Sequence, residues 1–494
     1  MSDFFCTFAP KFVKKMKKYV FLSLWLLLAV CAQAESKAER VFAEQEGTRN
    51  ASISALVVNA RTGQVIDQYN PDLVLAPASC TKLLSTCTGL ELLGSDFCFP
   101  TYLEAHSPKE GEPFDGIIDG DLFIRGTGDP TLGSRDLGNR FFLGKWVNAL
   151  KRQGIKRVKG NIVADLSFLD NEATNPTWQW EDMGNYYAPG ISAIAYLDNT
   201  MVINLKSTAI GEKVRVLSTN PDYPGIEFEN NIRGAGINYD GAVVNGVPFS
   251  NTRYLRGSIP ANKEVFGLKG DLPNPGLLLA HHLRAALLDS GIVVDGDVAY
   301  TFDPDTLPRV ELYKHLSEPL SEIVKVTNID SNNLYAEQIF RYIGSRASTP
   351  ASIDNSIDVE RFCWSNRGVD LKTAIIHDGC GLSTNNAISA RQFVSLLTYM
   401  RNKSQNWDAF YASLPVSGES GTLSSVLKKT PLHGRVHAKS GTIAHVRSYA
   451  GYIECANGEV YTFAIIVNKA SCKSRVTRGQ IEKYLLAVCE ETFK

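Results

Sequence analysis

Ser79 and Lys82 stand three residues apart at the start of a segment that we expect to be helical. At that spacing two side chains lie on the same face of a helix. A serine hydroxyl is a weak nucleophile until a base takes its proton, and a neutral lysine beside it can act as that base. Because lysine is normally charged at neutral pH, it needs burial or a second cation nearby to become neutral. The pair therefore predicts covalent catalysis by serine, with another positive group close to it.

The Ser-x-x-Lys spacing is weak by itself, because Ser425 and Lys428 repeat it and a solvent-exposed helix face explains such a pair equally well. Its position relative to two later motifs is more informative. A Ser-x-Asn motif follows at residues 331–333, and a Lys-Ser-Gly-Thr run follows at 439–442 within a β-like segment. The Lys-[Ser/Thr]-Gly pattern occurs once in the chain. Three motifs in this order indicate a serine acyl-enzyme site.

On these motifs the chain resembles the penicillin-recognising serine enzymes. About 250 residues separate Lys82 from Ser331, and a gap of this length is similar to that of D-alanyl-D-alanine carboxypeptidases/endopeptidases of the penicillin-binding protein 4 type, the low-molecular-mass class C penicillin-binding proteins. Further stretches that resemble this family lie at residues 126–132, 187–190, 378–383 and 414–418.

The resemblance implies a role for each motif residue. Ser79 would attack the carbonyl of the penultimate D-Ala, and Lys82 would accept its proton. Ser331 would relay a proton to the departing D-Ala, while Asn333 would orient Lys82 and the substrate amide. Lys439 completes the catalytic set.

Substrate binding is assigned by the same resemblance. Lys439 and the Ser440 hydroxyl would hold the terminal carboxylate, and the backbone N–H groups of Ser79 and Thr442 would form the oxyanion hole. The implied partners are peptidoglycan peptides and β-lactam antibiotics, which would acylate Ser79 and leave slowly.

The sequence also departs from the family pattern. Thr384 stands where arginine is frequent, and Ala444-His445 replaces a more usual polar-glycine pair. Asp182 resembles the family's acidic contact for the diamino-acid side chain of the substrate. The preference for that side chain is therefore left open, as is the balance between carboxypeptidase and endopeptidase action.

Two other functions compete with this interpretation. A β-lactamase would use the same chemistry, but the long gap and the lack of an obvious deacylating glutamate motif argue against it. A catalytically silent peptidoglycan-binding protein would not need the intact motif residues Ser79, Lys82, Ser331, Asn333 and Lys439.

The elements that must position these residues lie at both ends of the chain. Alternating β-like runs occur at 52–60 and 64–67 and again at 449–454 and 459–468, with Gly-containing turns inside each pair. We expect helices over 79–93, closed by Gly94, and near 480–491. Strands at both ends with helices between them predict one sheet built from the two termini.

The predicted fold class is therefore α/β (α+β), a transpeptidase/β-lactamase-like domain with an antiparallel sheet and helices. We assign residues 35–105 and 300–494 to this domain. Many short β-like runs separated by Gly, Pro and Asn fill residues 106–299, which we interpret as a β-rich insertion of one domain or two nested ones.

The N-terminus has the pattern of a secretory signal. Lysines precede an apolar run over 19–32, which ends in Ala32-Gln33-Ala34 and a polar segment. A transmembrane anchor is the alternative, but the run is shorter than the roughly 20 apolar residues that a span needs. We expect residues 1–34 to be cleaved, Met1 or Met16 to be the start, and the mature protein to lie in the periplasm with at most peripheral membrane association.

Composition excludes several other classes of protein. The 494 residues carry a net charge of -1, which gives no electrostatic reason to expect nucleic acid as a partner. The sequence contains no HExxH motif or Cys/His cluster, so no metal or cofactor is expected. Ten cysteines occur, eight of them after residue 34, with no CxxC pair and no disulfide pattern that the sequence can decide.

Overall fold

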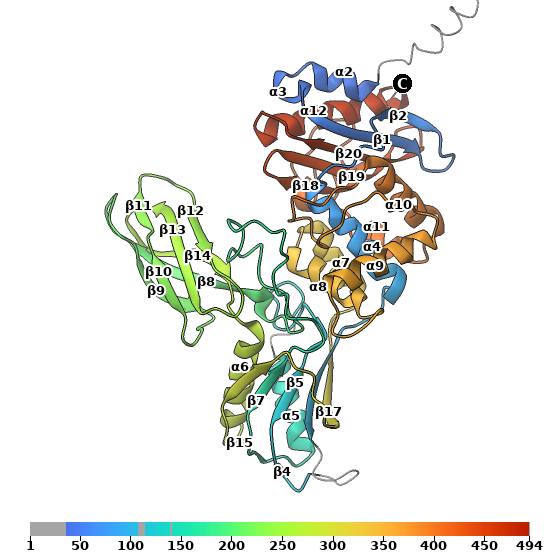
Figure 1. Ribbon diagram of the computed structural model, residues 1–494. Helices are drawn as coiled ribbons and strands as arrows, with labels where there is room; N and C mark the ends of the chain where they lie inside the picture. Colours follow the sequence, from blue (N-terminus) through green and yellow to red (C-terminus); the bar gives the residue numbers. More distant parts are fainter. Residues whose placement is uncertain (1–35, 107–113, 139–140, 494) are drawn as a thin grey trace, which may run out of the picture.

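The computed structural model describes residues 36–106, 114–138 and 141–493. The signal sequence predicted for residues 1–34 lies outside this range. Within it, no helix combines the length and the apolar character that crossing a membrane requires. Figure 1 shows three lobes, of which the largest contains both ends of the described chain.

The largest lobe is built on an antiparallel five-stranded sheet in the order β18-β19-β20-β1-β2. Strand β1 pairs along its whole length with β20, so the two ends of the chain meet in the middle of the sheet. This confirms the prediction of one sheet made from both termini. The strands are β1 (Ser52–Asn59), β2 (Val65–Tyr69), β18 (Val436–Ile443), β19 (Val446–Glu454) and β20 (Val460–Asn468).

Helices cover both faces of this sheet, because its central strands are apolar on both sides. Leu56 and Val58 of β1 join one hydrophobic cluster, whereas Ala55 and Val57, which point to the opposite face, join the other. The second cluster contains α2 (Lys37–Ala43) and α12 (Ser474–Cys489), with the short α3 (Glu46–Arg49) and η4 (Glu490–Phe493) beside them.

The helices on the first face surround α4 (Lys82–Leu93), which the turn η1 (Ala78–Thr81) precedes. Every residue of α4 from Lys82 to Leu90 is buried, as expected of a helix that is largely apolar all round. The helix expected over 79–93 is thus present with a 3-10 first turn, and it ends at Gly94, whose N–H bonds to Leu90. The other elements are α7 (Leu320–Ile329), α8 (Asn333–Gly344), α9 (Ile353–Ser365), α10 (Ala390–Lys403), α11 (Trp407–Ala412) and η3 (Gly421–Leu423).

The second lobe is a five-stranded mixed sheet in the order β16-β7-β5-β3-β17, which two helices accompany. A small parallel sheet, β15-β6-β4, extends it. The elements are β3 (Pro100–His106), β4 (Ile117–Ile118), β5 (Leu122–Arg125), α5 (Phe142–Arg152), β6 (Arg157–Val158), β7 (Ile162–Asp165), α6 (Pro275–Asp289), β15 (Val293–Val294), β16 (Val298–Thr301) and β17 (Arg309–Leu316).

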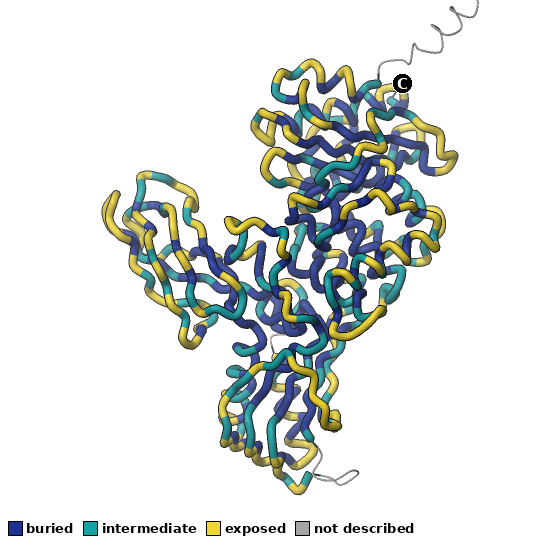
Figure 2. The backbone as a smooth tube through the Cα atoms, viewed as in Figure 1, coloured by how far each residue is buried: buried dark blue, intermediate teal, exposed yellow. Residues whose placement is uncertain are grey.

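The third lobe consists mainly of strands, in the sheets β14-β8-β9 and β10-β13-β11, with β12 paired to β13. Exposed residues line much of its outer rim, whereas buried stretches fill the largest lobe (Figure 2). Its elements are η2 (Leu197–Asn199), β8 (Thr200–Ser207), β9 (Arg215–Asn220), β10 (Glu227–Asn230), β11 (Arg233–Ala235), β12 (Gly241–Asn245), β13 (Thr252–Pro260) and β14 (Lys263–Asp271).

Strand pairing extends beyond the bounds that we expected for the insertion. Strands β3 and β17 pair with each other over 100–106 and 309–316, and β3 pairs with β5. Both segments therefore belong to the sheet of the second lobe, although we expected residues 100–105 and 309–316 in the catalytic part. The two strands are about 200 residues apart in sequence, and no pattern within either segment indicates which strand it pairs with.

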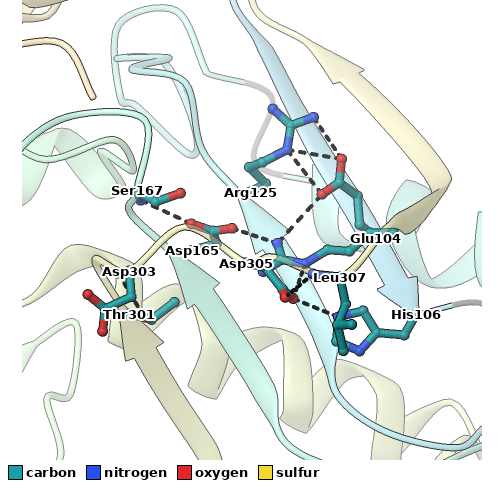
Figure 3. Close-up of polar contacts among 10 residues, drawn as sticks. Glu104, His106, Arg125, Asp165, Ser167, Thr301, Asp303, Asp305 and Leu307 are labelled. Atoms are coloured by element: carbon teal, nitrogen blue, oxygen red, sulfur yellow. Dashed lines mark hydrogen bonds and ion pairs between the residues drawn. The ribbon is translucent and has the colours of Figure 1, made fainter. Parts of the chain in front are cut away.

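An ion network that is buried at Asp165 and exposed at Asp305 anchors β17 in this sheet. Arg309 donates to Asp165 Oδ2 at 2.5 Å and to Asp305 Oδ2 at 2.9 Å, and its guanidinium lies 3.5 Å from the centre of the Phe123 ring. Figure 3 shows the acidic side chains of this network, in which His106 also contacts Asp305 at 2.6 Å. Only 1% of Asp165 is exposed, so its charge depends on this arginine for compensation.

Replacing Arg309 with methionine should lower the free energy of unfolding by about 3–5 kcal/mol, because it leaves the buried carboxylate of Asp165 unpaired. Thermal or denaturant unfolding measures this change. Lys159→Met is the matched control: it removes one cation from the exposed pair with Asp119, and its melting temperature should stay at the wild-type value. Equal stability of the two variants would contradict the role given to Arg309.

Candidate active site

Ser79 lies in the turn η1, which two close-packed segments enclose. A Cβ on Gly441 of β18 would lie 2.4 Å from Pro77 O and 3.0 Å from Ser79 N. A Cβ on Gly381 would lie 1.9 Å from Ala78 O, and Gly381 has a φ of 82°, which L side chains rarely adopt. Glycine at these two positions therefore lets the end of β18 and the 378–383 loop approach the turn that carries Ser79.

Lys82 occupies the first position of α4 with its ammonium group between three acceptors. Its Nζ lies 3.0 Å from Ser79 Oγ, 2.6 Å from Asn333 Oδ1 and 2.6 Å from Cys380 O. A charged lysine has three N–H donors, and these contacts use all of them. Loss of one proton would leave a lone pair that can accept the hydroxyl proton of Ser79.

Burial favours that neutral form. The Lys82 side chain has no exposed surface, and this loss of hydration lowers the pKa of its ammonium group. Nearby buried acidic groups, Asp378 and Glu337 among them, raise that pKa, but their effect is smaller. The structure thus places a base of reduced pKa within hydrogen-bond distance of Ser79, which is the arrangement that activates a serine hydroxyl.

The Ser-x-Asn motif forms the junction between α7 and α8. Ser331 takes a left-handed backbone conformation with φ 60°, and the side chain of Asn332 caps α8 by accepting from Tyr335 N. Asn333, the first residue of α8, can therefore direct its amide into the site. Its Oδ1 accepts from Lys82, and its Nδ2 donates to Tyr187 O at 2.7 Å.

Lys439 of β18 supplies the second cation that the sequence predicted near Lys82. Its Nζ donates to Ser331 Oγ and to Ser440 O, both at 2.9 Å. It is fully buried, and this burial, together with the charge of Lys82, lowers the pKa of Lys439 to about 7. The charge of Lys82 thus weakens the charged form of Lys439.

Ser440 and Thr442 follow Lys439 on the same strand but make different contacts. The Ser440 hydroxyl donates to Thr422 Oγ1 at 2.8 Å. Thr442 Oγ1 accepts from Arg447 Nη1 at 2.6 Å, and Thr442 is exposed at the cavity beside Ser79. The structure therefore brings together all seven residues that the sequence selected for the site.

A cavity of about 330 Å³ opens beside Ser79. Asp182 and Tyr187 line one wall, and the Tyr187 hydroxyl donates to Asp182 Oδ1 at 2.9 Å. Burial raises the pKa of Asp182. The complete lining is Ser79, Gln179, Glu181, Asp182, Tyr187, Ser331, Asn333, Gly381, Leu382, Thr384, Thr442, Ile443 and Ala444.

Sequence reasoning missed the groups that hold the 378–383 loop against Lys82. Glu337 Oε1 accepts from the N–H groups of Gly379 and Cys380, both at 2.7 Å, and so fixes the Cys380 carbonyl that faces Lys82. Asp378 accepts from Gly381 N and Ser383 N of the same loop. Glu337 lies one helical turn after Asn333, and no motif in the sequence distinguishes it.

Other residues that the sequence left open lie elsewhere. Ser425 and Lys428, the second Ser-x-x-Lys pair, are both exposed. His437 stacks on Tyr411 with a ring separation of 4.5 Å. His445 takes a φ of 59°, a left-handed conformation that glycine, the residue that the resemblance led us to expect at this turn, adopts more readily.

Comparisons with known proteins agree with this geometry. The chain matches the D-Ala-D-Ala carboxypeptidase 3 (S13) family over residues 37–487. A D-alanyl-D-alanine carboxypeptidase of an Actinomadura species is 30% identical over 443 residues, covering 86% of this chain and 79% of that protein. The crystal structure of penicillin binding protein 4 (dacB) from Haemophilus influenzae is similar, with a TM-score of 0.77 and 25% identity, covering 92% of this chain and 98% of that one. Its complex with a β-lactam has a TM-score of 0.75 and 24% identity, covering 93% and 99%.

The fold is thus the predicted penicillin-recognising α/β class, and the protein is a serine-type carboxypeptidase, a hydrolase. The chain belongs to the D-Ala-D-Ala carboxypeptidase 3 (S13) family. Both the fold class and the family predicted from the sequence are confirmed.

Proposed function

We propose that this enzyme removes D-Ala from peptidoglycan stem peptides, cuts D-Ala cross-links, or does both, through an acyl-enzyme on Ser79. The observation that carries the proposal is the position of Lys82 Nζ, 3.0 Å from Ser79 Oγ and in contact with Asn333. A neutral lysine there accepts the hydroxyl proton as Oγ attacks the carbonyl of the penultimate D-Ala.

The remaining motif residues complete the reaction. Negative charge that develops on the carbonyl oxygen is stabilised by the backbone N–H groups of Ser79 and Thr442. The C–N bond then breaks, and the departing amine takes a proton by way of Ser331, whose hydroxyl contacts Lys439. Water attacks the acyl-enzyme, Lys82 again takes a proton, and Ser79 is released with the shortened peptide.

The cavity beside Ser79 would receive the acyl part of the substrate. Glu181 and Asp182 are the acidic groups there, and Thr384 and Ala444 stand at the positions where the sequence departs from the family. Penicillins would acylate the same serine, which the β-lactam complex of the Haemophilus influenzae relative supports.

We further propose that the protein acts in the periplasm after cleavage of the signal over residues 1–34, with at most peripheral membrane association. The largest lobe is proposed as the catalytic domain and the second and third lobes as the insertion, which extends past the expected bounds of 106–299 to include β3 and β17. The rival functions, a β-lactamase and a catalytically silent peptidoglycan-binding protein, make different predictions in the following experiment.

Purified enzyme is incubated with muropeptide monomers and D,D-cross-linked dimers, and the products are read by mass. Loss of one D-Ala from monomers indicates carboxypeptidase action, and conversion of dimers to monomers indicates endopeptidase action. In parallel, a labelled penicillin should form a stable adduct that peptide mapping locates on Ser79. Rapid hydrolysis of the drug with intact muropeptides would favour the β-lactamase, and neither product nor adduct would favour the silent binding protein.

The proposed mechanism predicts a bell-shaped dependence of the acylation rate on pH. The rate should rise with pH as Lys82 loses its proton and can act as a base. It should fall again above about pH 7, because Lys439, whose pKa is lowered to about 7, then loses the charge that binds the substrate carboxylate. Since the two lysines interact, the two apparent values belong to the pair. Penicillin acylation measured at constant ionic strength tests this, and a rate that stays level on the alkaline side would contradict it.

A further inference from the structure

Two of the acceptors around Lys82 are held by one face of α8. Asn333, the first residue of this helix, accepts from Lys82 directly through its Oδ1. Glu337 follows four residues later, which places it on the same helix face, and its Oε1 accepts from Gly379 N and Cys380 N, both at 2.7 Å. The Cys380 carbonyl in turn accepts from Lys82 Nζ at 2.6 Å. The helix that begins in the Ser-x-Asn motif therefore reaches the base twice, the second time through the loop that contains Cys380.

The contact between Glu337 and this loop is buried. Only 3% of Glu337 is exposed, and Cys380 has no exposed surface. A Cβ on Gly379 would lie 2.3 Å from Phe340 Cβ, so the loop packs directly against α8. A buried N–H group that loses its partner is costly. Loss of the Glu337 acceptor would therefore force the backbone at Gly379 and Cys380 to move, and the carbonyl that faces Lys82 would move with it.

The other side of this carbonyl is held from within the loop. Asp378 Oδ1 accepts from Gly381 N at 2.8 Å, which belongs to the same peptide group as the Cys380 carbonyl. Asp378 fixes the shape of the loop, whereas Glu337 ties that loop to the helix that carries Asn333. Glu337 is thus the group that sets the distance between the loop and the rest of the site.

The contact does not need a charge on Glu337. Burial, and after it the charge of Asp378, raise the pKa of Glu337 to about 8. The carboxyl group is therefore largely neutral below that pH, and a neutral carboxyl group keeps a carbonyl oxygen that accepts hydrogen bonds. Glutamine has the same shape and the same acceptor, so it is the conservative replacement at this position.

Several other ionisable groups face Lys82 and Glu337. Those around Lys82 are Cys80 of η1, Glu337 of α8, Asp378 and Cys380 of the loop, and Lys439 of β18. Those around Glu337 are Arg341 of α8, Glu360 of α9, Asp378 and Cys380. Substitution of Glu337 leaves all the others in place, so a change in pH dependence reports on the contact of Glu337 with the loop.

We propose that Glu337 is a positioning residue for the Ser79 reaction, which acts by holding the Cys380 carbonyl in contact with the ammonium group of Lys82. The inference rests on the proposed function, because it requires Lys82 to be the base. The carbonyl stabilises Lys82 once it has taken the proton of Ser79, and it directs the same nitrogen toward Ser79 Oγ. Glu337 acts through the loop rather than on the substrate, and the sequence motifs do not include it.

The test is the pH dependence of penicillin acylation in variants of Glu337. Glu337→Leu removes the acceptor, so the ammonium form of Lys82 should lose the support of the carbonyl. The rising, acidic limb of the rate should then shift to lower pH by about one unit. The maximal rate should fall about 10- to 100-fold, because the base is no longer directed at Ser79.

Two milder variants refine this result. Glu337→Gln keeps the acceptor, so it should keep the wild-type acidic limb and a maximal rate within about threefold of wild type. Glu337→Asp keeps the carboxyl group but is one methylene shorter, so it should show the same shift and the same loss in reduced form.

Glu360→Leu is the matched control. Glu360 lies on α9, is 1% exposed and influences Glu337 electrostatically. Its Oε1 has no hydrogen-bond partner within residues 36–106, 114–138 and 141–493. The variant makes the same substitution in a neighbouring buried acid but leaves the acceptor of the Gly379 and Cys380 N–H groups in place. It should keep the wild-type acidic limb and the wild-type maximal rate.

A lowered rate with an unshifted acidic limb in Glu337→Leu would indicate a purely structural role and overturn the proposal. A loss in Glu337→Gln as large as that in Glu337→Leu, or the same shift in Glu360→Leu, would overturn it as well. If Glu337→Leu does not fold, Glu337→Asp decides, and a wild-type limb and rate in that variant would overturn the proposal. Wild-type enzyme that forms no penicillin adduct would overturn the proposed function itself, whereas normal wild-type acylation with unshifted limbs in the variants overturns only the role of Glu337.

Discussion

Replacing Ser79 with alanine is expected to abolish the penicillin adduct and to lower peptide hydrolysis by at least about 10⁴-fold. The methyl group keeps the shape of the turn η1 but removes the only atom that Lys82 can activate there. Fluorescent penicillin after denaturing electrophoresis reads the adduct, and mass analysis of muropeptides reads turnover.

The second Ser-x-x-Lys pair provides the control for this experiment. Ser425→Ala alters a pair with identical spacing but exposed side chains, so it should keep wild-type labelling and turnover. Lys82→Met should lose at least about 10³-fold in acylation, and the double variant with Ser79→Ala should be no worse than Ser79→Ala alone, because the two residues act as one unit. Labelling that persists in Ser79→Ala would refute the assignment of the nucleophile.

The parts of the site that could be predicted are those whose signal is local. Ser79 and Lys82 share one helix face, and the Ser-x-Asn and Lys-Ser-Gly motifs each keep their residues adjacent in sequence. The strands at both chain ends were also predictable, because alternation and turn residues are properties of short segments. Sequence order and motif spacing together were therefore enough to select the residues that meet in the structure.

The remaining parts depend on contacts between distant segments. The Cys380 carbonyl that faces Lys82 is a backbone group, and no residue type reports its position. Arg447 contacts Thr442 because the register of β19 against β18 places the two residues opposite each other, and no local pattern in the sequence shows that register. Strands β3 and β17 pair across about 200 residues, so the bounds of the insertion could not be deduced from local composition.

Gly441 is a position where the packing of the site permits little change. A Cβ added there would lie 2.3 Å from Ser448 Oγ, 2.4 Å from Pro77 O and 3.0 Å from Ser79 N. The first contact involves a small side chain, but the other two involve the backbone of the turn that carries the nucleophile. Alanine at 441 must therefore push β18 away from η1.

Gly441→Ala should consequently lower acylation by at least about 10²-fold, because it moves both Lys439 and the N–H of Thr442 relative to Ser79. It should also lower the free energy of unfolding by about 1–3 kcal/mol, as overpacked sites do. Penicillin labelling rates and thermal unfolding measure the two effects.

Two further variants separate the backbone clash from other causes. Gly479→Ala, in α12, adds a methyl group where nothing lies within 4 Å, and it should keep activity and gain about 0.5–1 kcal/mol of stability. Adding Ser448→Ala to Gly441→Ala removes the nearest side-chain atom but leaves Pro77 O and Ser79 N in place. Activity should therefore stay low in the double variant, and recovery to the wild-type rate would show that the side chain of Ser448, rather than the turn, sets the limit.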